Sequence, residues 1–558
     1  MSHPILQVKN LNISFPTSTE LFHAVKDVSF DLHSGETLSL IGESGSGKSV
    51  TASALMQLID NPGRIDSGEI FYSDKENEIL DIAKLDPKSE ICRSLRCFNF
   101  SLISQEPMSA LSPVHKVGDQ IKEVLCLIDS TMTKGEAHSR AIELLYQVQM
   151  PEPESLINKY SFELSGGQRQ RVVIAMAIAS QPDVLIADEP TTALDVTTQA
   201  EILSLLADLQ KEYGMAILFI THDLGVVAQI SDRVAVMEQG ELVECGEVAQ
   251  IFEKPQHPYT CKLMNATRAL EHKSIIKIPF EFEKNTTNSQ ILTIKNLSKK
   301  FEKPSGFFEK KQFITAVNHA NLELYPRESL GIVGESGSGK STLGRAILGL
   351  SPATEGRISY LASHDGEIVD LSNYKRKPRD ILFSQLRLIF QDPWSSLNPR
   401  MTVFDILEEP LIKLQPDLNK DERTLRVRDM MDWVGLKADF SSRYPHAFSG
   451  GQRQRIVIAR ALITQPKVVI ADEATAALDV SLRSQVLDLL IEYQNRYGTS
   501  FILITHDIAT VKYFCDRVIV LKEGEIVEQG TVDEVIFHSK HPYTKRLIAA
   551  VPIAEVTH

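Results

Sequence analysis

The sequence has 558 residues, of which 43% are hydrophobic and 24% charged, as expected for a folded globular protein of two or more domains. Its 59 Lys and Arg residues against 73 Asp and Glu give a net charge of −14, which argues against a protein that binds nucleic acid over its whole surface. Six cysteines without regular spacing predict a reducing compartment, and neither a signal peptide nor an apolar run of about 18 residues that could span a membrane is expected.

One ordered set of motifs occurs twice along the chain. GESGSGKS, SGGQRQR, IADE, ITHD and HPYT each appear once in either half, and the first of them begins at Gly42 and again at Gly334. A period of this length is too long for a solenoid and predicts two copies of one large domain. We expect domain 1 over residues 1–268, a polar linker without helical or strand period over 269–290, and domain 2 over 291–558.

Each half alternates between predicted strands and helices. The segments ILQVKNLNISF and ILTIKNLSKKF, at the start of each half, alternate in polarity and predict antiparallel edge strands. Further along come four pairs of short apolar runs, TLSLIG and SLGIVG, DVLIAD and KVVIAD, AILFIT and FILITH, and RVAVM and RVIVL. These runs predict buried strands of a parallel sheet. Each half is therefore expected to be an α/β domain with an added antiparallel β-subdomain.

A phosphate-binding loop follows the first buried strand of each half. Both loops fit the pattern G-x-x-x-x-G-K-[ST] between a predicted strand and a predicted helix. The glycines let backbone N–H groups turn inward around phosphate oxygens, and the positive end of the next helix faces the same anion. The lysine supplies a full charge, and the serine after it offers a hydroxyl to Mg²⁺. The predicted phosphate contacts are Gly42, Glu43, Ser44, Gly45, Ser46, Gly47, Lys48 and Ser49, and Gly334, Glu335, Ser336, Gly337, Ser338, Gly339, Lys340 and Ser341.

Two neighbouring acids end a later strand in each half. Asp188 and Asp472 are placed where a carboxylate can hold Mg²⁺. Glu189 and Glu473 come directly after them, and because consecutive strand residues point to opposite sides, each glutamate can face an attacking water as a general base. An isolated Asp-Glu pair would more often cap a helix or lie on the surface. The phosphate loop in the same half favours the catalytic interpretation.

At SGGQ the sequence resembles a known family. The segments LSGGQ (164–168) and FSGGQ (448–452), each combined with a phosphate loop, strand-end acids and a downstream histidine in the same order, resemble the ATPase subunits of ABC transporters. The resemblance covers nearly the whole chain twice. It implies two tandem P-loop NTPase domains, each with an antiparallel β-subdomain and a helical subdomain. It also implies ATP and Mg²⁺ as cofactors, and ATP hydrolysis coupled to solute transport.

The resemblance also implies roles for single residues. Gln105 and Gln391 would reach Mg²⁺ and the attacking water, and His222 and His506 would contact the γ-phosphate. An aromatic under the adenine is implied at Phe15 and Phe301, although a strand-end phenylalanine is as often a core residue. The implied Mg²⁺ ligands are Ser49, Gln105, Asp188, Ser341, Gln391 and Asp472.

The SGGQ segments begin a predicted helix and form a second cradle of backbone N–H groups. In the family, one ATP lies between the phosphate loop of one domain and the SGGQ of the other. The resemblance therefore implies two composite sites in this chain, one pairing Lys48 with Ser449 and one pairing Lys340 with Ser165. Both halves keep their glutamate, histidine and glutamine, so we expect two hydrolytic sites. The residues of the two cradles are Ser165, Gly166, Gly167 and Gln168, and Ser449, Gly450, Gly451 and Gln452.

Several segments resemble the importers of oligopeptides and dipeptides: QEPMSALSPV (105–114), FQDPWSSLNPRMTV (390–403), FEKPSGFFEKKQ (301–312) and both HPYT motifs. Most such importers use two separate ATPase chains, but a fused form, as in the microcin C and glutathione importers, fits this length. Relatives often carry a cysteine-rich extension for an iron–sulfur cluster. We expect no cluster here, because within the first half only Cys261 follows HPYT and in the second half no cysteine follows it; Cys92 and Cys97 lack a partner pair.

The resemblance places the protein at the cytoplasmic face of the bacterial inner membrane. Its implied partners are two transmembrane permease subunits and an extracytoplasmic solute-binding protein that acts through them, with no nucleic acid. Segments 105–125 and 391–411 are expected to dock to the permeases, with contacts from Met108, Leu111, Trp394 and Leu397. The alternative is that apolar residues of these segments, Trp394 among them, pack in the core. A basic run at 375–379 is expected to be a solvated face, the alternative being contact with the membrane or a permease.

The alternative function is that of a tandem ABC translation factor acting on ribosomes. That class carries a long, charged, helical linker between its domains, whereas residues 269–290 are few and not basic. The resemblance implies peptides or peptide-like solutes as the cargo, the alternatives among relatives being nickel, glutathione and opines. Selectivity among these belongs to the permeases and the binding protein.

Overall fold

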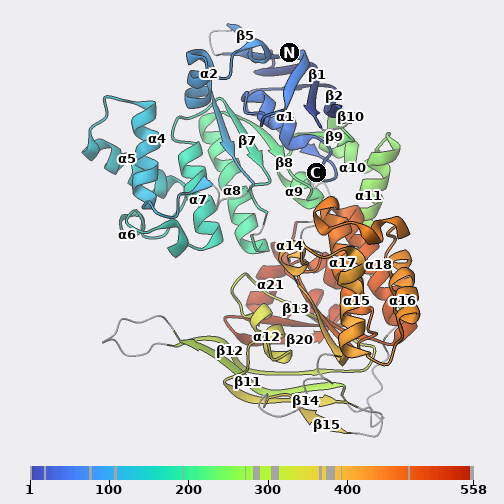
Figure 1. The fold of residues 1–558 in the computed structure, drawn as a ribbon. Helices are drawn as coiled ribbons and strands as arrows, with labels where there is room; N and C mark the ends of the chain where they lie inside the picture. Colours follow the sequence, from blue (N-terminus) through green and yellow to red (C-terminus); the bar gives the residue numbers. More distant parts are fainter. Residues whose placement is uncertain are drawn as a thin grey trace. The chain divides into compact units, whose positions relative to one another are not determined.

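The structure is a computed structural model that describes residues 3–17, 21–74, 78–105, 110–192, 194–270, 272–274, 276–278, 280, 290–302, 313–362, 367–372, 384–390, 392–475, 478–552 and 554. It consists of two compact units, Met1–Asn265 with Pro552–His558 (domain 1) and Ala266–Val551 (domain 2). The described residues of the expected linker thus belong to domain 2. The boundaries at 268 and 291 stay a prediction. Figure 1 shows the elements of each domain.

Domain 1 has an antiparallel sheet formed around its first strand. The strand order is β2-β1-β4-β5, and the residues of β1 alternate between buried and exposed positions except at the bulges in its pairing with both neighbours. This sheet is the antiparallel β-subdomain that the sequence predicts. Its strands are β1 (Leu6–Pro16), β2 (Leu21–Leu32), β4 (Arg64–Ser73) and β5 (Ile79–Asp81).

The second sheet of domain 1 carries the motifs. Its order is β10-β9-β3-β8-β7-β6, and all neighbours are parallel except β9 and β10. The fully buried β3 lies between β8 and β9, so the loop after β3 leaves from inside the sheet. The strands are β3 (Thr37–Ile41), β6 (Phe100–Ile103), β7 (Val184–Asp188), β8 (Ala216–Ile220), β9 (Arg233–Glu238) and β10 (Glu241–Glu247).

Helices cover the mixed sheet of domain 1. In Figure 1, α4, α5 and α6 lie together beside α7 and form the helical subdomain, whose apolar side chains join one core with those of α7 and α8. The helices are α1 (Lys48–Leu55), α2 (Glu90–Ser94), α4 (Val117–Ile128), α5 (Lys134–Gln147), α6 (Pro153–Leu156), α7 (Gly166–Ala177), α8 (Val196–Tyr213), α9 (Leu224–Ile230), α10 (Val248–Glu253) and α11 (Pro258–Leu270), with shorter helical turns at Ile82–Lys84, Leu95–Asn99 and Ser161–Glu163.

Domain 2 repeats both sheets, which confirms the predicted duplication. Their orders are β12-β11-β14-β15 and β16-β17-β18-β13-β19-β20. The second order equals that of the mixed sheet of domain 1 when the latter is read from β6 to β10. The strands are β11 (Leu292–Glu302), β12 (Phe313–Leu324), β13 (Ser329–Val333), β14 (Glu355–Leu361), β15 (Ile368–Asp370), β16 (Leu386–Ile389), β17 (Val468–Asp472), β18 (Ser500–Ile504), β19 (Arg517–Lys522) and β20 (Glu525–Thr531).

The helices of domain 2 follow the same sequence of elements. Residues of α15, α16, α17 and α18 contribute to its largest apolar core. The helices are α12 (Lys340–Ile347), α14 (Pro393–Ser396), α15 (Val403–Leu414), α16 (Lys420–Trp433), α17 (Gly450–Leu462), α18 (Val480–Tyr497), α19 (Ile508–Phe514), α20 (Val532–Ile536) and α21 (Pro542–Ala549), with shorter turns at Ala438–Ser442 and Pro445–Ala447.

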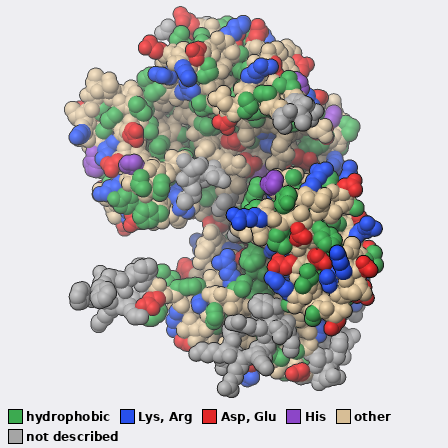
Figure 2. Space-filling model, viewed as in Figure 1, with side chains coloured by type: hydrophobic (Ala, Val, Ile, Leu, Met, Phe, Trp, Pro, Cys, Tyr) green, Lys and Arg blue, Asp and Glu red, His purple; other side chains and the backbone are tan. Residues whose placement is uncertain are grey.

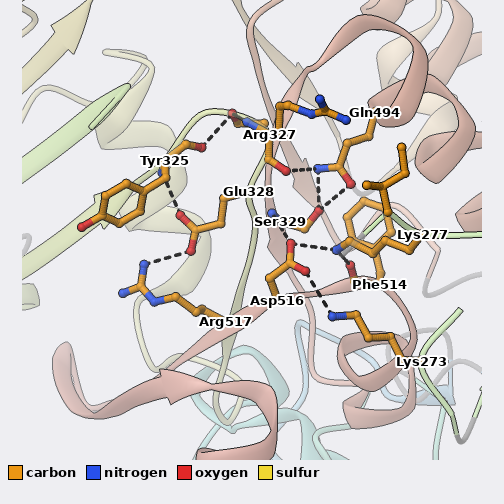
Figure 3. Close-up of polar contacts among 12 residues, drawn as sticks. Lys273, Lys277, Tyr325, Arg327, Glu328, Ser329, Gln494, Phe514, Asp516 and Arg517 are labelled. Carbon is orange, nitrogen blue, oxygen red and sulfur yellow. Dashed lines mark hydrogen bonds and ion pairs between the residues drawn. The ribbon is translucent and has the colours of Figure 1, made fainter. Parts of the chain in front are cut away.

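Residues that follow α11 are anchored in domain 2 by a buried lysine. The Lys277 side chain is 1% exposed, and its Nζ lies 2.9 Å from Asp516 Oδ2 and donates to the backbone carbonyl of Phe514. Lys273 Nζ lies 3.3 Å from the other carboxylate oxygen of Asp516, Oδ1. Asp516 Oδ2 also accepts a hydrogen bond from the backbone N–H of Ser329. Figure 3 shows both lysines directed at this one carboxylate. Burial lowers the pKa of Lys277, and the charge of Asp516 opposes that shift.

Acidic and basic side chains are intermixed on the face of each domain seen in Figure 2. The acidic excess of the chain is therefore not concentrated in one patch on that face. Among the described residues, no helix combines the length and the apolar character needed to cross a lipid bilayer.

Candidate active site

Each phosphate loop leaves the central strand of its mixed sheet and leads into a helix, α1 or α12, whose first residue is the loop lysine. Gly42 has φ 151°, and a Cβ atom there would lie 2.2 Å from the backbone oxygen of Met237. The equivalent Gly334 has φ 155° and the same 2.2 Å approach, to Leu521. Only glycine fits this turn, because any side chain would collide with the neighbouring strand. Both loops thus have the backbone shape of a phosphate cradle.

The two loop lysines are held inside their own loops. Lys48 is 6% exposed, and its Nζ donates to the backbone oxygens of Gly42 and Glu43, both at 2.8 Å. Lys340 Nζ makes the matching bonds, at 2.8 Å to Gly334 and 2.7 Å to the next residue. These bonds keep each ammonium at the centre of the cradle, at the helix N-terminus, where both charges attract an anion.

A serine hydroxyl and a strand-end carboxylate lie next to each loop. Ser341 Oγ donates a hydrogen bond to Asp472 Oδ1 at 2.9 Å. In domain 1, a hydrogen bond from Ser49 lowers the pKa of Asp188, but burial raises that pKa by more. Asp188 Oδ1 is buried and has no hydrogen-bond partner among the described residues. Oxygen donors of this kind are the ligands that Mg²⁺ prefers, so the residues present fit a magnesium site.

Three strand ends bring their side chains together at Glu189. This residue follows β7 with φ 47°, and its N–H donates to Ile220 at the end of β8 at 2.8 Å. Its Oε1 lies 3.0 Å from His222 Nδ1. Its Oε2 accepts from Gln105 Nε2 at 3.0 Å and from Thr192 Oγ1 at 2.9 Å. A left-handed backbone is uncommon for glutamate, and the bond to β8 fixes it here.

Domain 2 repeats this cluster as far as the described residues extend. Glu473 has φ 48°, and its N–H donates to Ile504 at 2.9 Å. Its Oε1 lies 3.4 Å from His506 Nδ1. Gln391 lies outside the described residues. Each histidine therefore contacts the glutamate of its own domain.

The two acids of each pair are shifted in opposite directions. Burial raises the pKa of Asp188, the charge of Glu189 adds to the rise, and the loop lysine opposes it. Burial alone would also raise the pKa of Glu189, but the hydrogen bond and charge of His222, together with smaller effects of Thr192 and Lys48, outweigh it, so that pKa is lowered. The equivalent acids of domain 2 shift in the same directions. The glutamate is thus the acid held ionised, as a proton acceptor requires.

Each SGGQ segment forms the N-terminus of a helix. Ser165 caps α7, accepting from the Gln168 N–H at 3.3 Å while its own N–H donates to Gln168 Oε1 at 3.1 Å. Ser449 and Gln452 cap α17 with the same two distances. The reciprocal bonds fix the serine at the helix start, beside the two glycine N–H groups of the first turn.

The two predicted adenine-stacking phenylalanines differ in exposure. Phe15 is half-buried and packs against the core of domain 1, and a Cβ atom on Gly63 would lie 2.4 Å from its ring. Phe301 is 43% exposed, and Lys299 Nζ lies 5.0 Å from the centroid of its ring. Stacking on adenine stays a prediction for both.

Two tyrosines that the sequence interpretation left without a role contact the phosphate loops. The backbone N–H of Glu43 donates to the hydroxyl oxygen of Tyr259, and that of Glu335 to Tyr543, both at 3.0 Å. The two tyrosines are 7% and 3% exposed. Each is the tyrosine of an HPYT motif, so the carboxyl-terminal part of each domain holds the second residue of its own phosphate loop.

A glutamate accepts backbone hydrogen bonds at the start of each HPYT motif and so fixes its position. Glu244 accepts from the N–H groups of Gln256 and His257, at 2.8 and 3.0 Å, and His257 Nδ1 accepts from the Tyr259 N–H at 3.3 Å. In domain 2, Glu528 accepts from the equivalent pair at 2.7 and 3.2 Å. Recurrence of HPYT at the same place in both halves was the one sequence signal that could have pointed to these residues.

The expected permease contacts are only partly compatible with the structure. Leu111 and Leu397 are 2% and 4% exposed and belong to the apolar cores, so the expectation that they contact a permease is wrong. Trp394 is 61% exposed, with the Arg453 guanidinium 3.4 Å from its ring centroid. Met108 and the basic run at 375–379 lie outside the described residues.

Comparisons with known proteins agree with the repeated motifs. The family described as ABC transporter matches residues 25–192 and 317–476, and the oligopeptide/dipeptide transporter C-terminal region matches 243–289 and 527–557. The chain is 44% identical to the glutathione import ATP-binding protein GsiA of Escherichia coli K12 and of Shigella flexneri, over 99% of this chain and 90% of theirs. A solved ATP-binding cassette, MJ0796 bound to ADP and Pi, is 29% identical and covers 43% of this chain and 98% of its own, with a TM-score of 0.38. The family and sequence matches do not favour a translation factor that acts on ribosomes.

Proposed function

The chain belongs to the ATP-binding proteins of ABC transporters, in the oligopeptide/dipeptide importer family, and from that premise we propose its solute, its site residues and its partners. It is an ATPase that powers an importer. The proposed solute is glutathione or a short peptide of similar size, since the curated relatives described above are named for glutathione import. Peptide-like cargo also agrees with the family description of residues 243–289 and 527–557.

The observation that supports the proposed chemistry is the cluster around Glu189, repeated at Glu473. The loop lysines and loop N–H groups bind the phosphates of ATP. The Ser49–Asp188 pair and its domain 2 counterpart would hold Mg²⁺, which supplies charge neutralisation on the phosphates. Each glutamate, kept ionised by its histidine, takes a proton from the attacking water. Gln105 and Gln391 help to place that water.

We propose that both domains hydrolyse ATP. Each carries the lysine, the two acids and the histidine, so neither domain is degenerate in these groups. The pairing of Lys48 with Ser449 and of Lys340 with Ser165 rests on the family resemblance and stays a prediction. The absence of an iron–sulfur cluster also stays a prediction. It rests on the cysteines: in the first half only Cys261 follows the HPYT motif, and in the second half no cysteine follows it.

The proposed partners are two permease subunits and an extracytoplasmic binding protein that delivers the solute to them. The protein would lie at the cytoplasmic face of the bacterial inner membrane, bound to the permeases from that side. The family supports a permease partner in general. The number of subunits, the binding protein and the membrane face are proposals.

Uptake into proteoliposomes tests the function. The full chain, its permease pair and the binding protein are reconstituted, and ATP-driven uptake of radiolabelled glutathione is compared with that of labelled dipeptides and tripeptides. We expect uptake of at least one of them, and a fall in ATP turnover of roughly 10²–10⁴-fold when Glu189 and Glu473 are both replaced by Gln, with ATP still bound. Uptake without ATP, or near-normal turnover in the double variant, would contradict the proposal.

A further inference from the structure

The turn that follows β7 places a threonine hydroxyl beside Glu189. The Thr192 N–H donates to the backbone oxygen of Glu189 at 3.1 Å, which closes a four-residue turn with Pro190 at its second position. Proline favours that position because its ring fixes φ in the range that the turn requires. From this turn, Thr192 Oγ1 donates to Glu189 Oε2 at 2.9 Å. A backbone bond and a side-chain bond thus join the same two residues.

The other side chains in contact with Glu189 have a second expected partner, the bound nucleotide. Gln105 Nε2 donates to the same oxygen, Oε2, at 3.0 Å, and His222 Nδ1 lies 3.0 Å from Oε1. The family resemblance assigns Gln105 to the attacking water and His222 to the γ-phosphate, so both can change partners when ATP binds. Thr192 is short and β-branched and lies in a closed turn, so its hydroxyl has few other positions to adopt. It is the donor that can keep the Glu189 carboxylate oriented while the other two move.

Domain 2 has no hydroxyl at the matching position. The third residue after Glu473 is Ala476, at the place that Thr192 takes in domain 1. Ala474 likewise replaces Pro190. A methyl group cannot donate a hydrogen bond, and alanine restricts the backbone less than proline does. The sequence of domain 2 therefore lacks both the donor and the residue that favours its turn.

Domain 2 instead has a charged contact next to its histidine. Asp507, which directly follows His506 and caps α19, accepts from Arg483 Nη1 at 2.6 Å. The fourth residue of α18 is Arg483, and the fourth of α8 is Gln199, whose Nε2 lies 3.3 Å from Asp223 Oδ2. A short charge-assisted bond is stronger than a long bond from an amide. The two clusters are thus fixed by different contacts, at the glutamate in domain 1 and beside the histidine in domain 2.

We propose that Thr192 is a positioning residue for ATP hydrolysis in domain 1, and that the two ATP sites differ in the hydrolytic step because domain 2 lacks this hydroxyl. The inference rests on the proposed function, in which both domains hydrolyse ATP. The hydroxyl takes no part in the proton transfer itself. It orients the Glu189 carboxylate toward the attacking water, and a base that is already oriented has less freedom to lose in the transition state.

Single-turnover hydrolysis by the full chain, measured separately in each domain, tests this. The protein is loaded with azido-ATP labelled in the α- or the γ-phosphate, hydrolysis is started with Mg²⁺, and the nucleotide is cross-linked by light at successive times. After digestion the labelled peptides are assigned to their domains, and loss of γ-label relative to α-label reports hydrolysis in each. The wild type is compared with Thr192→Val, which keeps the shape without the hydroxyl, and with Thr192→Ser, which keeps the hydroxyl.

We expect Thr192→Val to slow hydrolysis in domain 1 by roughly 3- to 10-fold, the effect of one hydrogen bond, and to leave domain 2 within about twofold of wild type. Thr192→Ser should recover most of the rate. The affinity of both variants for a non-hydrolysable ATP analogue should equal that of the wild type, because the lost bond is to Glu189 and not to the nucleotide. Thr131→Val is the matched control, since Thr131 is also exposed and donates to a carboxylate, Asp129 Oδ1 at 2.6 Å, in the turn between α4 and α5.

A rate in domain 1 within about twofold of wild type for Thr192→Val overturns the inference, as does a serine variant as slow as the valine variant. Equal slowing in both domains, equal slowing by Thr131→Val, or a loss of analogue affinity that accounts for the slower rate also overturns it, because none of these comes from orienting Glu189. All of these results leave the proposed function standing. Absence of hydrolysis in either domain of the wild type refutes the proposed function and this inference with it.

Discussion

Replacing Tyr259 by Phe should weaken ATP binding in domain 1 while leaving the fold intact. The substitution removes one hydroxyl, and with it the 3.0 Å hydrogen bond from the Glu43 N–H. The ring is 7% exposed and Phe fills almost the same volume, so no cavity opens. A bond of this kind contributes about 0.5–1.5 kcal/mol, which corresponds to an increase of about 2- to 10-fold in the dissociation constant for ATP.

Isothermal titration of the full chain with a non-hydrolysable ATP analogue measures this change, and steady-state kinetics locates it. The loop binds the phosphates equally in the ground state and in the transition state. Its weakening should therefore raise KM and leave kcat within about twofold of the wild-type value. Tyr493→Phe is the matched control, because that buried hydroxyl also bonds to backbone, the Leu462 carbonyl, but in another part of the fold. Equal ATP binding by Tyr259→Phe and wild type, or an equal loss in the control, would refute the role of this hydroxyl.

Further predictions concern the other parts of the site and its anchor. Ser165→Arg should stop hydrolysis at the phosphate loop of domain 2 rather than of domain 1, which trapping of labelled nucleotide followed by domain mapping can show. His222→Ala, together with the same change in domain 2, removes the largest effect that opposes burial at Glu189. The pKa of Glu189 then rises, and the residual turnover should be lost at a higher pH on acidification than in the wild type, as a pH–rate profile would reveal. Lys277→Met should destabilise domain 2 by about 3 kcal/mol, since it leaves Asp516 buried with a weaker partner; unchanged urea unfolding would contradict this.

Local sequence carried enough information for the phosphate loops. The loop from Gly42 to Lys48 follows its strand directly in the sequence, so its geometry can be predicted from one short pattern. The strand-end acids were predictable for the same reason, because Asp188 ends an apolar strand and Glu189 follows it directly, whereas the left-handed backbone of Glu189 was not predicted. The two-domain architecture followed from the repeat itself.

Contacts between distant segments were not predictable in this way. Tyr259 and Glu43 are 216 residues apart, and no local pattern joins them. Leu111 and Leu397 were placed at the surface because they lie in loops, yet apolar loop residues fold back onto the core when the loop is short. The segment around Lys277 looked like a spacer because it is polar, although its lysine finds a buried carboxylate.

The anchoring of Lys277 affects how the chain can be divided for experiments. A cut placed at Ile291, where the composition changes, would discard the lysines that neutralise Asp516, and the released half would carry a buried, uncompensated negative charge beside β13. Domain 2 expressed by itself therefore has to start near Ala266. Limited proteolysis of the intact protein should likewise spare the backbone around Lys277, although nothing in its amino-acid composition would suggest resistance.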